Sequence, residues 1–185
     1  MKLKKFKFKI VNSTNDIAIR LIKKTNNKFG IIVADKQKKG RGQHGNQWIS
    51  YKGNLFVSIF FSLDKINMSL KQLTKTNCFL IKKTLSQFCK KKIYIKPPND
   101  LLINKKKICG ILQETLKKAD STYFIVGVGI NLIKSPHIEN YPTTSILELT
   151  KTKVKKKIII SELANIYEKF IDKVSKLSLK AVKNL

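Results

Sequence analysis

The sequence predicts an α+β domain with a mixed, mostly antiparallel sheet and flanking helices. Two observations support this class: most expected strands follow one another through short turns, and the expected helices are inserted among them without regular alternation. The length of 185 residues and the hydrophobic content of 42% suit about one globular domain. We therefore expect a single domain over residues 1–185, in which residues from about 151 to 185 form a C-terminal helical extension.

The first elements follow from the spacing of apolar residues. Residues 3–11 alternate polar and apolar side chains, which indicates a strand. Side chains that can cap a helix then precede an apolar pattern of helical spacing, so a helix is expected from residues 13–16 to about Lys24. A short buried strand over residues 29–34 leads into a glycine-rich loop, and a run rich in β-branched and aromatic residues predicts a strand over residues 54–62.

The second half of the sequence predicts one long helix, then a group of strands, and helices again toward the C-terminus. Apolar positions three and four residues apart favour a helix over residues 69–90. Beyond Thr143 the chain is expected to be helical, briefly at first and then from about Lys156 to its end. Short apolar runs predict four more strands and one tight turn. The strands cover residues 93–95, 101–103, 107–116 and 123–132, and the turn covers residues 104–106.

The charge and the cysteines narrow the class of protein. The formal net charge is +28, but Arg20 and Arg41 are the only arginines and the lysines are scattered along the chain. Specific readout of nucleic acid favours arginine, so we expect only weak, salt-sensitive binding to polyanions and no specific nucleic acid partner. The three cysteines form no CxxC pair, the two histidines show no metal-ligand spacing, and no run approaches the ~20 apolar residues that cross a membrane. These features predict a cytoplasmic protein without a membrane partner or direct protein ligands to a metal.

Residues 38–50, KKGRGQHGNQWIS, form the densest polar motif. Glycines in such a loop allow positive φ angles and let a ligand approach the backbone. Successive N–H groups in such a turn can converge on an anion, Arg41 can fork onto a carboxylate or phosphate, and Trp48 offers a flat face. Taken alone, the segment is also compatible with an ordinary turn. The glycines concerned are Gly40, Gly42 and Gly45.

Two further motifs combine glycine with polar side chains. In residues 95–114, IKPPNDLLINKKKICGILQE, two prolines force the backbone out of a strand, and Asn99 follows at the bend. Lys107 then opens a strand that reaches Gly110, where another backbone or a ligand can come close. In residues 126–131, VGVGIN, glycines interrupt an apolar strand and indicate the approach of something flat. A solvated lysine hairpin is the plainer interpretation of the first motif.

In this order, the motifs resemble those of the biotin protein ligases, also called biotin–[acetyl-CoA carboxylase] ligases. Each motif is weak alone, but the ordered series spans about residues 6 to 150 and is specific. The matching pieces are STN at 13–15, Gln37, GRG at 40–42 with Gly45 and Trp48, GNLFVS at 53–58, KPPND at 96–100, Lys107 to Gly110 leading into ILQE, GVGIN at 127–131 and YPTTSI at 141–146.

The resemblance implies a single catalytic domain that joins biotin to ATP, with Mg²⁺, and passes the biotinyl group from biotinyl-5′-AMP to a lysine of the biotin carboxyl carrier protein of acetyl-CoA carboxylase. It implies the fold of the biotin/lipoate ligase catalytic domain, similar to class II aminoacyl-tRNA synthetases, as a monomer or a homodimer. The catalytic residues it implies are Lys107 and Arg41. The biotin-binding residues it implies are Ser13, Thr14, Asn15, Gln37, Gly40, Arg41, Gly42, Lys107 and Gly110. The ATP-binding residues it implies are Gly45, Trp48, Asn99, Lys107 and Asn131.

Three departures from the family pattern carry expectations. The loop has Gln43 where an arginine is usual, so we expect faster release of biotinyl-AMP than from an arginine-bearing relative. Pro97 stands in place of a tryptophan, so part of the biotin pocket wall is expected to differ. The chain is expected to lack the N-terminal DNA-binding domain of the repressor-type members, and the C-terminal β-domain as a whole or in large part, so repression of transcription is not expected.

Two alternatives stay open at this point. A lipoate or octanoyl ligase or transferase of the same fold would modify a similar carrier domain, and an octanoyl transferase would use a cysteine nucleophile such as Cys109. We expect Cys109 to be a small core residue instead, because no partner base is evident and its neighbours Ile108 and Ile111 face inward. A basic nucleic-acid-binding protein, with the glycine loop on a phosphate, is the alternative from another class.

Overall fold

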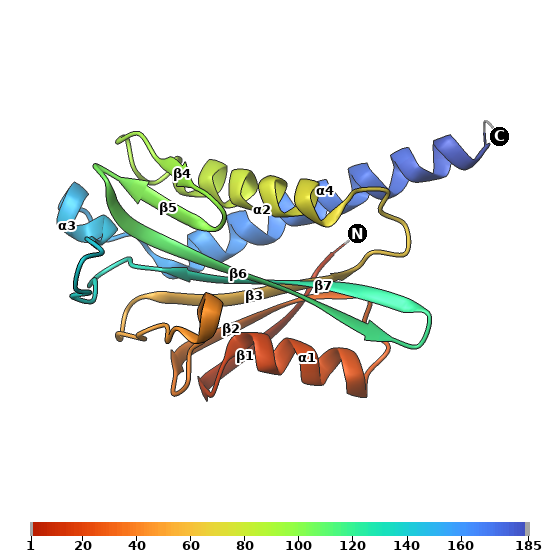
Figure 1. Cartoon of the computed structure of the whole chain (residues 1–185), viewed down its shortest axis with the longest axis horizontal. Coiled ribbons are helices and arrows are strands. Elements are labelled where there is room, and N and C mark those ends of the chain that lie inside the picture. Colours follow the sequence, from red (N-terminus) through yellow and green to blue (C-terminus); the bar gives the residue numbers. More distant parts are fainter. Residues whose placement is uncertain (1, 184–185) are drawn as a thin grey trace.

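The computed structural model describes residues 2–183, with side chains through Lys176, and its strands form a seven-stranded sheet (Figure 1). The order across the sheet is β1-β2-β3-β7-β6-β5-β4. Within these residues β1 and β2 are the only parallel neighbours, which confirms the predicted mixed, mostly antiparallel sheet. The strands are β1 Lys4–Val11, β2 Phe29–Gln37, β3 Leu55–Ser62, β4 Tyr94–Lys96, β5 Asp100–Ile103, β6 Lys106–Lys118 and β7 Ser121–Ile130.

Helices cover both faces of the sheet (Figure 1). α1 lies against β2, β3 and β7 on one face, while α2 and α4 lie together on the other. α1 also connects the two parallel strands, as a crossover between parallel neighbours requires. Among the described helices, none has the length and apolar composition needed to cross a membrane. The helices are α1 Thr14–Lys24, α2 Leu70–Leu85, α3 Ile146–Thr150 and α4 Lys156–Lys183, with a short 3₁₀ turn, η1, at Gln43–Gly45.

Each face of the sheet has its own apolar core. Leu73 of α2 and Tyr167 of α4 are fully buried in the larger core, together with inward residues of the strands. On the opposite face, Ile22 of α1 packs in a smaller cluster with Ile32 and Phe60. The first half of α4 is thus an integral part of the core, and the sheet lies between the two apolar layers.

Several element boundaries differ from the predicted ones, and for two of them the reason lies in tertiary structure. β2 continues past the predicted end at residue 34, because its parallel pairing with β1 extends to the Val11–Gln37 pair. This longer strand brings Gln37 to the start of α1. α2 ends at Leu85, before the predicted Lys90, because a tight turn follows in which Phe88 packs against the core.

Candidate active site

A cavity of about 720 Å³ lies between the glycine loop and the β4–β5 turn. The start of α1, the first half of β6, the end of β7 and the loop of residues 136–143 complete its lining. Gly40 and Gly45 shape the loop outside the lining: a Cβ on Gly40 would meet the backbone oxygen of Trp48 at 2.5 Å, and Gly45 has a φ of +78°. The predicted residues that line the cavity are Ser13, Thr14, Asn15, Gln37, Arg41, Gly42, Trp48, Asn99, Lys107, Gly110 and Asn131.

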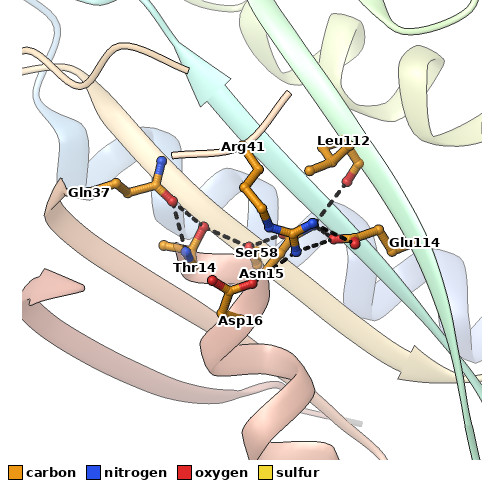
Figure 2. A network of polar contacts seen from close by, with 8 residues as sticks. All are labelled: Thr14, Asn15, Asp16, Gln37, Arg41, Ser58, Leu112 and Glu114. Atoms are coloured by element: carbon orange, nitrogen blue, oxygen red, sulfur yellow. Dashed lines mark hydrogen bonds and ion pairs between the residues drawn. The ribbon is translucent and has the colours of Figure 1, made fainter. Parts of the chain in front are cut away.

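One end of the cavity is a hydrogen-bonding cluster around the start of α1 (Figure 2). Thr14 donates to Gln37 Oε1 from its backbone N–H at 2.8 Å and from its hydroxyl at 3.1 Å. The hydroxyl of Ser58, on β3, lies 2.7 Å from Thr14 Oγ1 and 2.5 Å from Asn15 Oδ1. Asn15 in turn donates to Glu114 Oε2 at 2.6 Å. The cluster therefore fixes the orientation of several hydroxyl and amide groups, as recognition of a polar ligand requires.

Three other predicted residues line the cavity, and they differ in whether the protein itself hydrogen-bonds their side chains. Asn99 Nδ2 donates to the backbone oxygen of Ile111 at 3.0 Å, and Asn131 Nδ2 donates to that of Thr144 at 3.3 Å. Both amides thus brace neighbouring segments of the cavity wall. Ser13 is the N-cap residue of α1, but its side chain forms no capping hydrogen bond. Its hydroxyl is therefore not committed to the helix.

A β-bulge in β6 turns Lys107 into the cavity. The register between β5 and β6 shifts by one residue at Ile108, which is the extra residue of the bulge. Strict alternation would place Lys107 on the same face as Cys109, which is fully buried in the larger core. With the bulge, Lys107 instead lies over Gly110, with Nζ 3.3 Å from the position of a Cβ there.

Aromatic rings and one carboxylate hold the Lys107 ammonium. Lys107 Nζ lies 2.9 Å from Asp100 Oδ1, 5.5 Å from the ring centroid of Trp48 and 5.4 Å from that of Tyr141. The Tyr141 hydroxyl donates to Asp100 Oδ2 at 2.7 Å. Burial, together with this contact to Asp100, raises the pKa of Tyr141 above its ordinary value, so the phenol stays a neutral donor. Lys107 is thus held in position between two rings and a carboxylate.

The indole of Trp48 covers a pair of glycines on β6 and β7. Gly110 and Gly129 are direct neighbours across these strands. A Cβ on Gly129 would lie 2.3 Å from Trp48 Cε2, and one on Gly110 would lie 2.6 Å from Cζ3. The flat group that approaches these glycines is therefore a side chain of the protein, and Gly127 makes similar room for Asn15. Trp48 Nε1 is buried without a hydrogen-bond partner in the described part of the chain, which makes it a candidate donor to a ligand.

The glycine loop closes as a small hairpin. The Trp48 N–H donates to the backbone oxygen of Gly40 at 2.9 Å, and the Gly42 N–H donates to that of Asn46 at 2.7 Å. An isolated bridge between Arg41 and Gln47 lies between these two bonds. The backbone of the hairpin is thus ordered by its own hydrogen bonds, and backbone hydrogen bonds from Lys38 and Lys39 join the start of the loop to the end of β1.

Arg41 is the polar side chain that ties this hairpin to the sheet (Figure 2). Its guanidinium forms a bidentate ion pair with Glu114 of β6, at 2.9 and 2.8 Å, and a further contact of 2.9 Å with Asp16 of α1. The hydrogen bonding to Glu114 raises the pKa of Arg41 above its ordinary value. Protein carboxylates therefore neutralise Arg41 in this conformation, and its contact with a substrate carboxylate stays a prediction.

Sequence reasoning left out several residues of this site. The chain has only 11 acidic residues, and three of them, Asp16, Asp100 and Glu114, meet the two predicted cations. Because acidic residues are rare in a chain of charge +28, their positions beside the motifs could have indicated partners for these cations. Ser58 and Tyr141 stand in the matching motifs GNLFVS and YPTTSI, but the sequence does not indicate their partners, which only the folded chain brings to them.

The fold and the cavity define an α+β domain in which one cavity combines an oriented polar cluster with an ion-paired lysine. Comparison with known proteins gives the family: residues 7–131 match the biotin/lipoate A/B protein ligase family, and the chain belongs to it.

Named relatives of the chain are biotin ligases. The bifunctional ligase/repressor BirA of Bacillus subtilis is 29% identical over 168 residues, which cover 86% of this chain and 51% of that protein. The Escherichia coli protein of the same name is 31% identical over 126 residues, 66% of this chain and 39% of the relative. The chain thus spans about half, or less, of the length of these relatives.

Solved structures share the fold. A biotin protein ligase from Aquifex aeolicus in complex with biotin and ATP has a TM-score of 0.78 and 28% identity, over 94% of this chain and 72% of that one. The Leishmania major biotin protein ligase in complex with biotinyl-5-AMP has a TM-score of 0.80 over 98% of this chain and 80% of that one. Its identity of 21% shows the fold alone.

Proposed function

We propose that this chain is an ATP-dependent biotin protein ligase, which forms biotinyl-5′-AMP and transfers the biotinyl group to a lysine of a carrier protein. One observation carries the proposal: a single cavity holds both the hydrogen-bonding cluster at Thr14, Asn15 and Gln37 and the ammonium of Lys107. The similarity to the Aquifex aeolicus ligase, which was solved with biotin and ATP, supports it.

The polar end of the cavity favours biotin over a lipoyl substrate. The ureido ring of biotin offers two N–H donors and one carbonyl acceptor, whereas the dithiolane ring of lipoate has neither group. Thr14, Asn15 and Gln37 already hydrogen-bond within the cluster, and the donor and acceptor capacity that remains to them would find no partner on the dithiolane. A site built to hydrogen-bond its substrate rejects an analogue that lacks these groups by about 10⁴-fold.

In the first step, an oxygen of the biotin carboxylate attacks the α-phosphorus of ATP, and the bond to pyrophosphate breaks. Two anions must approach one another, so a fixed cation in a water-poor site lowers the barrier. Lys107 is that cation in our proposal, because the bulge and its aromatic neighbours hold it inside the cavity. Mg²⁺ enters as part of MgATP, since it is commonly held by substrate phosphates, and no cluster of three or more metal-binding side chains occurs among the described residues.

In the second step, the amine of the acceptor lysine attacks the acyl carbon, AMP leaves, and the amine loses a proton. A covalent enzyme intermediate is not needed. The octanoyl transferase alternative needs a cysteine nucleophile, and Cys109 is poorly suited to that role. It is fully buried, and this burial raises the pKa of its thiol well above the ordinary value.

The acceptor we propose is the biotin carboxyl carrier protein of acetyl-CoA carboxylase. A Paracoccus denitrificans relative named biotin–[acetyl-CoA-carboxylase] ligase is 29% identical over 108 residues, 57% of this chain and 45% of that protein. The net charge of +28 would also speed the encounter with an acidic carrier domain at low salt.

The test is transfer of labelled biotin to a purified carrier domain in the presence of ATP and Mg²⁺. Lys107→Met should reduce biotin-dependent ATP–pyrophosphate exchange by about 100-fold, the usual cost of losing one preorganised charge stabiliser. The matched control is Lys106→Met, because Lys106 is the exposed neighbour on the same strand.

Three outcomes would contradict the proposal. The wild-type protein could fail to form biotinyl-AMP, Lys107→Met could exchange as fast as Lys106→Met, or labelled lipoate could be activated in preference to biotin. Sequence-selective DNA binding that persists above about 0.3 M salt would favour the nucleic-acid alternative instead.

A further inference from the structure

Glu114 touches two residues of the cavity wall from behind. It lies on β6, with its side chain 26% exposed, and Arg41 and Asn15 line the cavity in front of it. One carboxylate oxygen, Oε1, accepts from Arg41 Nη1 at 2.9 Å. The other, Oε2, accepts from Arg41 Nη2 at 2.8 Å and from Asn15 Nδ2 at 2.6 Å. A single carboxylate therefore joins the glycine loop to the polar end of the cavity (Figure 2).

The loop has two attachment points along β6. Trp48 rests on Gly110, and Arg41 reaches Glu114 four residues further along the strand. The first attachment is a packing contact, and the second is a charged, bidentate one with fixed geometry. The backbone hydrogen bonds of residues 40–48 close on the hairpin itself, and the loop is joined to the end of β1 only at its start, through Lys38 and Lys39, so these side chains hold the tip of the loop against β6.

Glu114 also sets the orientation of the Asn15 amide. Because Glu114 Oε2 and the backbone oxygen of Leu112 both accept from Asn15 Nδ2, the amide oxygen Oδ1 must face Ser58. The Ser58 hydroxyl also lies against Thr14. Which groups of the cluster donate and which accept therefore depends on the Glu114 carboxylate.

We propose that Glu114 is a positioning residue, which holds the glycine loop closed through Arg41 and orients the hydrogen-bonding cluster through Asn15, without touching the substrate. The inference rests on the proposed ligase function for its kinetic consequence, namely slow escape of biotinyl-AMP. Its structural consequence does not depend on that function. Asp16 is the weaker second partner of Arg41, because it makes one contact where Glu114 makes two and its side chain is 45% exposed.

The structural part can be tested without substrates, because Trp48 is the only tryptophan of the chain and lies in the loop. Glu114→Gln replaces the carboxylate by an isosteric amide, which has no negative charge and keeps only one of the two acceptor oxygens that hold Arg41. We expect acrylamide quenching of Trp48 to increase about twofold, as a partly exposed ion pair of modest strength is lost. The matched control is Asp120→Asn, which removes one negative charge from an exposed position of the same β6–β7 ribbon and should quench like the wild type.

A double-variant comparison tests whether Glu114 acts through Arg41. Arg41→Gln should increase quenching as Glu114→Gln does, and the two changes together should add nothing further. Arg41 is 38% exposed, so Arg41→Gln gives the same readout even if Glu114→Gln fails to fold. The inference would be overturned if Trp48 in Glu114→Gln were quenched as in the wild type. If Glu114→Gln does not fold, the same result in Arg41→Gln would overturn it. So would additive effects in the double variant.

The kinetic part follows the release of preformed biotinyl-AMP during a chase with excess biotin. We expect release to be about fivefold faster from Glu114→Gln than from the wild type or Asp120→Asn. Unchanged release together with increased quenching would overturn the link between loop and adenylate. If the wild type forms no adenylate, the proposed function fails, and the quenching result still decides the role of Glu114 in the loop.

Discussion

Gly129→Ala is expected to expel the Trp48 indole from its place over the sheet. The added Cβ would lie 2.3 Å from Trp48 Cε2, 2.6 Å from Cζ2 and 2.7 Å from Nε1. Carbon atoms pack at about 3.5–4.0 Å, so the ring must retreat by more than about 1 Å. β7 is paired with β3 on one side and β6 on the other, so the loop will give way before the strand.

The assay for this substitution combines activity with the emission of Trp48. A misplacement of about 1 Å at an active site costs about 100-fold, so kcat/KM for biotin-dependent ATP–pyrophosphate exchange should fall by about 100-fold. The emission of Trp48 should shift to longer wavelength as the ring leaves its packed position. The free energy of unfolding in urea should change by less than about 1 kcal/mol, because alanine loses less backbone entropy than glycine in a strand.

The clash itself can be isolated by removing the ring. In a Trp48→Ala background the new methyl group meets no indole, so adding Gly129→Ala should change activity by less than about twofold. Wild-type emission and activity in Gly129→Ala would refute the packing of Trp48 on this glycine. A second large loss in the Trp48→Ala background would refute the indole as the cause.

Two further predictions concern stability and thiol chemistry. Tyr167→Phe should lower the free energy of unfolding by about 1–3 kcal/mol, because the buried Tyr167 hydroxyl donates to Asn77 Oδ1 at 2.9 Å and its loss leaves that oxygen unpaired. Urea titration measures this loss, with Tyr94→Phe at an exposed position as the control. Equal losses in the two variants would contradict the prediction. Burial, and then Asp100, raises the pKa of the Cys78 thiol to about 11. The thiolate absorbance of Cys78, taken as the difference between the native protein and Cys78→Ser, should therefore still rise about tenfold per pH unit between pH 8 and 10, where the thiol of an unfolded chain levels off. A plateau of the native difference near pH 9 would contradict it.

The elements with strong periodicity were predictable, and tertiary pairing set their ends. The β-branched and aromatic run over residues 54–62 became β3, Leu55–Ser62, almost as predicted. β2 ran on to Gln37 because β1 offered it a partner, which nothing within residues 29–34 indicates. That extension matters for the site, since it places the Gln37 amide within reach of Thr14.

Motif order identified the residues of the cavity, but not what each one touches. The direction of Lys107 depends on a bulge between β5 and β6, and alternation along β6 alone would bury it. The resting place of Trp48 depends on Gly110 and Gly129 being paired across two strands. Such relations join residues far apart in the chain, so a local pattern cannot contain them.

The two cations predicted as a catalytic pair differ in how much of their hydrogen-bonding capacity is free. Arg41 has five N–H donors, and Glu114 and Asp16 already take up three of them. Lys107 has three donors and one ion pair, with Asp100, while the rings of Trp48 and Tyr141 flank the ammonium. A phosphate or carboxylate can therefore join Lys107 without breaking its ion pair, whereas the same contact at Arg41 competes with the attachment of the loop. We infer that Lys107 serves the chemical step and Arg41 serves loop closure, so Lys107→Met should slow adenylate formation and Glu114→Gln should speed adenylate release.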